Sequence, residues 1–479
     1  MHLSLIHQET LRKDCGLCRR SLLPGAICFF LLAAASVVAP GQAPSAPGVS
    51  ASAPPVVITL EEAIRRAQSS DSAFAEARAN GQSAVLDRAI AVAGLLPTAH
   101  LYNQDIYTQP NGIYSEGDAG QTSAPLPKFV ANDSRPHEYM AQGIVDEAFS
   151  LAGTAAVRHA NAAAAQASAE LEIARRGLVS GVTVLFYNSL AADHKLTVAQ
   201  TAHQEAADFT KITSEREQAR ESAHADVVKA QLEELQSARE LQDAQLEAEK
   251  AKLELGVLLF PDPQTPYTLS APDSAPPLAS KEDVQAAAAK YSPELKSALS
   301  ALGESTADVL AARAAYLPDF HFNVTYGIDA NQFAVNGPLV TANGSPFHAS
   351  NLGYSTTFTV NIPVWDWLST EHKIKQSEIK RDATQIALSA TQRQLIAKLD
   401  ETYSEAAAAR DQLDSLEQSV SIAAESLRLT KLAYQAGEAT VRDVVDAQNA
   451  YVTAENARED GRVRYETARA DLQTITGTM

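Results

Sequence analysis

Hydrophobic and polar residues follow two different periods along the chain. Apolar positions recur every three or four residues over most of its length, which predicts helices, and two of these helices close at Pro97 and Pro318. Apolar and polar residues alternate at 320–328 and 354–364, the pattern of half-buried strands. Less regular segments at 98–108 and 138–149 are also predicted as strands. The pattern therefore predicts a mostly helical protein with two pairs of strands.

The predicted helices differ in length. They are expected at about 59–93, 151–217, 225–258, 281–315, 368–433 and 441–477. The two of about 66 residues would each span roughly 100 Å, and two shorter helices of about 35 residues, end to end, match one of them. Segments 109–137 and 329–352 are rich in Asn, Gly and Pro and are predicted as long exposed loops.

Two internal matches indicate a duplicated chain. The sequence DVVKAQ at 226–231 agrees at five of six positions with DVVDAQ at 443–448, an offset of 217. A longer match sets 61–97 against 282–318, at an offset of 221. Two matches in the same order at nearly the same offset predict two repeats. We place these repeats at 56–260 and 278–479, separated by a Pro-rich linker at 261–277.

The first residues have the composition of a targeting segment. Arg19 and Arg20 precede an apolar run, which predicts a secretory signal peptide at 1–39 and a flexible lead-in at 40–55. All three cysteines, Cys15, Cys18 and Cys28, fall within the predicted signal peptide. A mature chain without cysteine would suit an oxidising compartment.

Composition and motifs argue against several function classes. The formal net charge is -19, whereas nucleic-acid binding needs a basic footprint. No nucleophile with its base, metal cluster or phosphate loop is found, so neither an enzyme nor a cofactor is expected. His194, His203 and His224 lack ligand-like spacing, and no metal site is assigned to them.

The four strands pose a closure problem. Strands with one apolar face and long loops resemble those of membrane barrels, but four strands cannot close a barrel and open edges are not tolerated in lipid. We therefore expect oligomerisation, with twelve strands from three chains as a plausible closure. The alternatives are a secreted coiled-coil scaffold or adhesin, which would leave the strands unexplained, and a periplasmic adaptor, which would carry a lipoyl-like or β-barrel module.

One group of motifs resembles a known family. It comprises LLP before Thr98, YLP before Asp319, VNIPVWD at 360–366, and the set Tyr434, Gly437, Thr440, Asp443, Val444, Asp446, Ala447 and Gln448. Together with the duplication, these motifs resemble the TolC-type outer-membrane efflux protein family. The resemblance implies a homotrimer of long coiled-coil helices, with a shared 12-stranded barrel in outer-membrane lipid and an α-helical tunnel through the periplasm. It also implies a passive exit duct for small molecules or proteins, which docks an inner-membrane transporter through a periplasmic adaptor.

The resemblance also implies a gate. Asp443 and Asp446 match the family's aspartate rings, so three chains would place six carboxylates around one opening. Crowded carboxylates raise each other's pKa and attract cations. The alternative is a solvated acidic pair near a helix start, where the helix dipole favours acids. The first repeat has Asp226 but Lys229 at the equivalent positions, so only the second repeat offers a double ring.

Other candidate residues have two interpretations each. Tyr434, beside Gly437, resembles the family's tip tyrosine that bonds across helices, and its alternative is an ordinary residue of the helix seam. Trp365 and Trp367 are either membrane-boundary aromatics or packing residues below the barrel. Ala439 stands where a basic residue is sometimes found, and Arg220 replaces the glycine in the first repeat, so the closing network is expected to differ from that of the family.

Overall fold

A computed structural model describes residues 56–107, 137–270, 278–330, 333–342 and 345–477. The predicted signal peptide and lead-in lie outside these residues. So do the predicted loop at 109–137, apart from residue 137, and residues 271–277 of the predicted linker.

The same helix order occurs twice along the described chain. The first set is α1 (Leu60–Ser70), α2 (Ser72–Ala93), α3 (Leu151–Gln218) and α4 (His224–Leu259), of 11, 22, 68 and 36 residues. The second set is α5 (Lys281–Tyr291), α6 (Pro293–Ala314), α7 (Ser369–Gln435) and α8 (Val441–Thr476), of 11, 22, 67 and 36 residues. At about 1.5 Å per residue, α3 and α7 are each roughly 100 Å long.

Each predicted helix at 59–93 and 281–315 is in fact two helices, so the prediction of single helices was wrong. The breaks fall at Asp71 and Ser292, whose backbones are extended. The Asp71 carboxylate accepts a hydrogen bond of 2.6 Å from the Phe74 amide, and the Ser292 hydroxyl accepts one of 3.2 Å from the Leu295 amide. These N-caps satisfy amides that a new helix start leaves without partners, and Pro293 suits the first position.

A four-stranded antiparallel sheet connects the helices. Its strands are β2 (Thr98–Tyr107), β3 (His137–Phe149), β5 (Asp319–Ala330) and β8 (Leu352–Asn361), in the order β2-β3-β5-β8. Strands β2 and β8 are its edges. Tyr326 lies opposite Gly143 on one side and Tyr354 on the other. This register places the apolar positions of β5 and β8 on one face and puts Asn323 and Thr325 on the other.

Two smaller pairings were not predicted. Strands β6 (Asn336–Ala342) and β7 (Ser345–Ser350) form a hairpin within 329–352, so the prediction of a continuous loop there was wrong. Short strands that contain Gly and Pro show no clear alternation of apolar and polar residues, so the sequence pattern did not indicate them. Strand β1 (Val56–Ile58) pairs in parallel with β4 (Tyr267–Leu269), inside the predicted linker, and three residues are too few to show a period.

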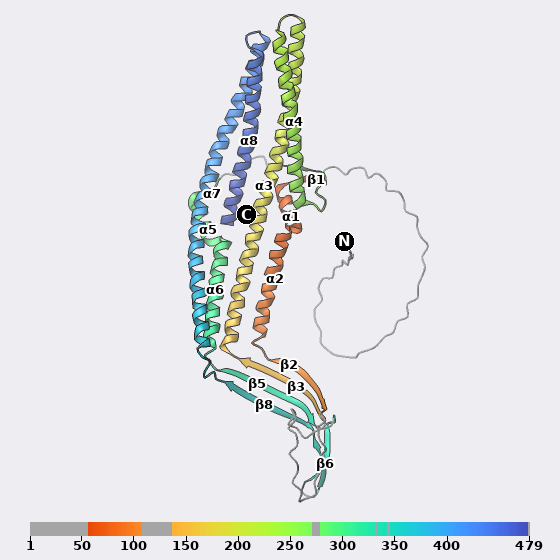
Figure 1. Cartoon of the computed structure of the whole chain (residues 1–479), viewed down its shortest axis with the longest axis vertical. Helices are drawn as coiled ribbons and strands as arrows, with labels where there is room; N and C mark the ends of the chain where they lie inside the picture. Colours follow the sequence, from red (N-terminus) through yellow and green to blue (C-terminus); the bar gives the residue numbers. More distant parts are fainter. Residues whose placement is uncertain (1–55, 108–136, 271–277, 331–332, 343–344, 478–479) are drawn as a thin grey trace, which may run out of the picture. The chain divides into compact units, whose positions relative to one another are not determined.

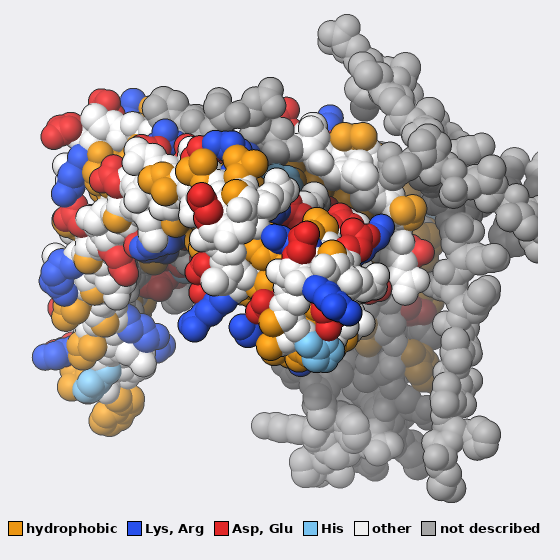
Figure 2. Space-filling view, turned by 90° about the horizontal axis from the view of Figure 1, so that it is seen from above, with side chains coloured by type: hydrophobic (Ala, Val, Ile, Leu, Met, Phe, Trp, Pro, Cys, Tyr) orange, Lys and Arg blue, Asp and Glu red, His pale blue; other side chains and the backbone are white. Residues whose placement is uncertain are grey.

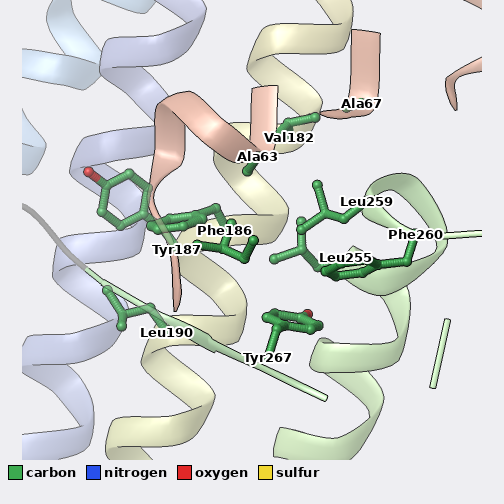
Figure 3. Close-up of a cluster of buried hydrophobic side chains, with 11 residues drawn as sticks. Ala63, Ala67, Val182, Phe186, Tyr187, Leu190, Leu255, Leu259, Phe260 and Tyr267 are labelled. Carbon is green, nitrogen blue, oxygen red and sulfur yellow. The ribbon is translucent and has the colours of Figure 1, made fainter. Parts of the chain in front are cut away.

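The two long helices carry the packing. Helix α3 packs against α2 and α6 in the half that follows the strands, and against α4 and α8 toward its far end, while α7 packs against α6 and α8 (Figure 1). The largest buried cluster forms where α1 and β4 meet α3 and α4, as Figure 3 shows. Its members include Phe186, Tyr187, Leu255 and Tyr267. None of the helices within the described residues has an apolar stretch long enough to traverse a lipid bilayer.

Candidate functional site at the helical turns

The turns α3–α4 and α7–α8 share one backbone geometry. Each follows a helix of roughly 100 Å, so each lies far from the strand from which that helix starts. In the second turn Gly437 has φ +81°, the Glu438 amide donates to the Ala433 carbonyl at 2.9 Å, and the Gly437 amide donates to the Tyr434 carbonyl at 3.0 Å. This pair of bonds is a Schellman motif, which requires a left-handed residue.

Arg220 occupies the same position in the first turn. Its φ is +63°, and the amides of Arg220 and Glu221 donate to the carbonyls of Glu217 and Arg216, each at 2.8 Å. The replacement of glycine by Arg220 therefore leaves the turn geometry intact. It carries the strain of a side chain in the left-handed region.

We expect Arg220→Gly to stabilise the first turn by about 1 kcal/mol, because glycine reaches a positive φ without the clash of a Cβ atom. Gly437→Arg is the matched reverse change and should cost a similar amount. A Cβ atom at Gly437 would meet nothing within 4 Å, so that cost reports backbone conformation alone. Thermal unfolding and the rate of limited proteolysis at each turn measure both changes. The two variants are expected to change stability in opposite directions, and a change in the same direction would contradict this account.

Tyr434 lies buried between helices α7 and α3. Its hydroxyl is 3.4 Å from the Thr213 hydroxyl, and its ring contacts Phe209 edge-on with centroids 5.0 Å apart. The Arg216 guanidinium lies 5.0 Å from the ring centroid and donates a hydrogen bond of 2.9 Å to the Tyr434 carbonyl. Within one chain, Tyr434 therefore joins α7 to the end of α3 through apolar, cation–π and hydrogen-bond contacts. Sequence reasoning did not identify Thr213, Arg216 or Phe209, because their role depends on helix packing.

Asp443 and Asp446 have different surroundings. The Asp443 carboxylate accepts hydrogen bonds of 2.8 Å from both the amide and the hydroxyl of Thr440, in a capping box at the start of α8. These bonds lower the pKa of Asp443, the backbone bond contributing most, with Arg442 adding to the effect. Asp446 is exposed and lies 3.5 Å from Arg442. Within one chain both aspartates are exposed, but Asp443 is engaged in holding the helix start, whereas Asp446 lies beside Arg442.

The first turn has no equivalent acidic pair. Its N-cap residue is Ala223, which has no side-chain cap, and Asp226 lies 3.5 Å from Lys229.

Seen from above, acidic and basic side chains occur together on the face shown in Figure 2. Within the described part of the chain, no three His, Cys, Asp or Glu side chains come together as metal ligands.

Polar contacts continue from the turns along α3 and α8. The Gln448 side-chain amide donates to the Ala202 carbonyl at 3.0 Å, and His194 lies 3.1 Å from the buried carboxylate of Glu459. Burial acts to raise the pKa of Glu459, but His194 and Arg458 outweigh it and lower that pKa to about 2. A cavity of about 300 Å³ lies between the two helices and is lined by residues that include His194 and Gln448. These contacts fix α8, which carries Asp443 and Asp446, against α3.

The two tryptophans lie beyond the sheet. Strand β8 ends at Asn361, three residues before the predicted end, and Trp365 and Trp367 follow in the segment that leads to α7. They are 69% and 83% exposed, and their rings meet edge-on at 5.7 Å. Within one chain, therefore, neither tryptophan is buried by packing below the sheet.

Comparisons with known proteins identify the fold. The chain has a TM-score of 0.70 to the CmeC outer membrane channel of Campylobacter jejuni, with 15% identity over 87% of this chain and 85% of that one. The TM-score to VceC of Vibrio cholerae, an outer membrane protein, is 0.69, with 17% identity over 87% and 96%. It is 0.66 to the open state of the MtrE outer membrane channel of Neisseria gonorrhoeae, with 16% identity over 87% and 88%. No curated protein matches the chain.

The fold is thus that of the outer-membrane channels. Residues 284–478, which include α6, β5, β8, α7 and α8, match the family model described as outer membrane efflux protein. The family match and the fold together confirm the resemblance to TolC-type outer-membrane efflux proteins. The matched family consists of channel proteins rather than enzymes.

Proposed function

We propose that three copies of this chain assemble into an outer-membrane exit channel whose helices extend into the periplasm. The channel would be the passive duct of a tripartite efflux or type I secretion system. It would dock an inner-membrane transporter through a periplasmic adaptor and export small molecules or proteins. The family match of residues 284–478 and the fold shared with outer-membrane channels support this assignment.

The incomplete sheet is the observation that carries the proposal. Strands β2 and β8 each have one partner among the described strands of the sheet, so both edges are open. The sheet has one face with Phe322, Val324 and Tyr326 and an opposite face with Asn323 and Thr325. The apolar face suits lipid, but the backbone groups of an open strand edge would have no hydrogen-bond partners there. The sheet can therefore lie in lipid only if its edges pair and close it into a barrel. Three copies of four strands would give twelve, with the polar face toward the lumen.

Assembly and conduction test the proposal. The full chain, expressed in a Gram-negative host and extracted from its outer membrane, should run as a trimer in unheated denaturing gels and as a monomer after boiling. The same preparation should form steady conducting pores in planar bilayers. Recovery as a soluble periplasmic monomer without conductance would refute the channel.

The gate at Asp443 and Asp446 is part of the proposal, and Asp446 is the residue to test. We expect Asp446→Asn to raise the divalent-cation concentration that half-blocks conductance by about tenfold, because it removes one charged ligand from each chain. Asp443 also caps α8, so replacing it would change the helix start as well as the charge. Asp226→Asn is the control, because it removes an acidic residue from the first turn at the position equivalent to Asp443, and it should leave the block unchanged. An unchanged block in Asp446→Asn would remove this residue from the gate.

A further inference from the structure

A cavity lies where the strands meet the helices. Its volume is about 590 Å³, and it is open to the outside. Its walls come from the end of β3, the start of β5, the start of α3 and the turns that follow α2 and α6. They include Leu95, Glu147, Phe149, Leu151, Leu317 and Phe320. Strands β3 and β5 are the two central strands of the sheet, so the cavity is formed within one chain and away from both open edges.

Glu147 is an unusual residue for this position. It lies directly opposite Phe322 in the register of β3 and β5, and therefore on the apolar face of the sheet. The residue is only 7% exposed, and its Oε2 atom has no hydrogen-bond partner in the described part of the chain. None of the residues that line the cavity is basic. A buried carboxylate without a partner is costly, so a cation from outside the chain would be stabilised here.

The surroundings of Glu147 are those of a membrane boundary. The cavity walls contain apolar side chains that remain exposed in one chain, among them Phe149 and Leu317. Asn361, the last residue of β8, lies opposite Asp319, the first residue of β5, so exposed Trp365 and Trp367 follow at this same end of the sheet. Tryptophan is enriched at the level of lipid headgroups. A ligand of this cavity would therefore meet Glu147 with its charged group and the apolar walls with a hydrocarbon part.

The start of α3 adds a second polar element. Leu151 and Thr154 of its first turn line the cavity, and the positive end of a helix favours an anionic group such as phosphate. A carboxylate and a helix start in one cavity complement a zwitterion better than a simple cation. An apolar wall beside them accommodates acyl chains.

We propose that this cavity binds one phospholipid of the surrounding membrane through a protonated primary amine, as in phosphatidylethanolamine. The ammonium group would donate to Glu147, the phosphate would lie at the start of α3, and the acyl chains would cover Phe149, Leu317 and Phe320. The inference depends on the proposed placement of the strands in the outer membrane.

Native mass spectrometry of the detergent-solubilised trimer tests the site. With phosphatidylethanolamine added, we expect three retained lipids per trimer, and about tenfold weaker retention in Glu147→Gln, because a charge-assisted hydrogen bond is lost. Phosphatidylglycerol, which has no amine, should be retained no better by the native chain than by Glu147→Gln. Asp105→Asn is the matched control, because it removes an exposed carboxylate from β2 outside the cavity and should retain the lipid fully.

A second variant and a competitor keep the test decisive. Leu317→Trp fills the cavity without changing Glu147 and should also reduce retention about tenfold. Equal retention by the native chain and both cavity variants would overturn the site. Dodecylammonium should compete at least about tenfold less well than phosphatidylethanolamine, because it lacks the phosphate. Equal competition would overturn the lipid assignment in favour of a cationic amphiphile. Conductance of each preparation is measured separately, so a conducting trimer without lipid retention rejects the lipid site and leaves the channel intact.

Discussion

Replacing Arg469 by methionine should lower the free energy of unfolding by about 3–5 kcal/mol, because it leaves a buried carboxylate without its partner. The Arg469 guanidinium lies 2.8 Å from the Glu466 carboxylate, whose side chain is only 2% exposed. Thermal unfolding of the full chain in detergent, followed by the helical circular dichroism signal, measures the change. Glu466→Gln introduced into the Arg469→Met chain should restore most of the loss. A double variant as unstable as the single one would contradict this account.

The pH dependence of this variant has a definite sign. Burial raises the pKa of Glu466 above 4.5, although Arg469 and Arg462 oppose the rise. A folded state that holds a proton more tightly than the unfolded state gains stability as the pH falls. Loss of Arg469 should raise this pKa further, so the stability gap between native and variant chains should be smaller near about pH 5 than near about pH 8. Arg428→Met is the matched control, because its exposed partner Glu425 is also three residues away, and it should change stability by less than about 0.5 kcal/mol.

Gly327→Val should destabilise the sheet by about 3 kcal/mol and remove most of the proposed heat-resistant trimer. A Cβ atom at Gly327 would overlap the carbonyl oxygen of Ala141 and lie 2.6 Å from the Cα atom of Gln142, so β3 and β5 would have to separate. The measurement is the temperature at which the trimer dissociates in denaturing gels.

Gly353 provides the control for this change. It lies directly opposite Gly327 on β8, but a Cβ atom there would meet nothing within 4 Å of one chain. Gly353→Val should therefore keep the proposed trimer, because valine also favours strands. Equal loss of trimer in both variants would show that the close approach of β3 and β5 is not the cause.

Sequence reasoning succeeded where one local signal dominates. Alternation over 320–328 and 354–364 indicated strands because one face of β5 and of β8 is apolar, and Pro97 and Pro318 marked helix ends because proline cannot continue a helix. It failed where the N-cap of a new helix interrupts a helical pattern that continues in the sequence. The apolar period continues across Asp71 and Ser292, yet their side chains bind the amides of the next helix and begin it anew.

The candidate site was predictable only in part. The motif at the second turn located Tyr434, Asp443 and Asp446, but the capping box that separates the roles of the two aspartates depends on Thr440 and on backbone geometry. The contacts of Tyr434 to Arg216 join residues 218 positions apart, and no local pattern reports such a distance. Glu147 escaped notice for the same reason, since its burial depends on residues from both halves of the chain.

The pairing of β1 with β4 bears on how a two-repeat chain could arise. It places Val56, at the start of the first helix set, beside Tyr267, just after the end of that set. In the second set, Val284 and Ala288 of α5 pack against Leu472 and Ile475 of α8. In each set, the end of the set therefore lies beside its beginning. Fusing two ancestral copies head to tail would then need only a short connection and no rearrangement of either copy. Such a gene duplication would halve the number of chains required to complete the proposed barrel.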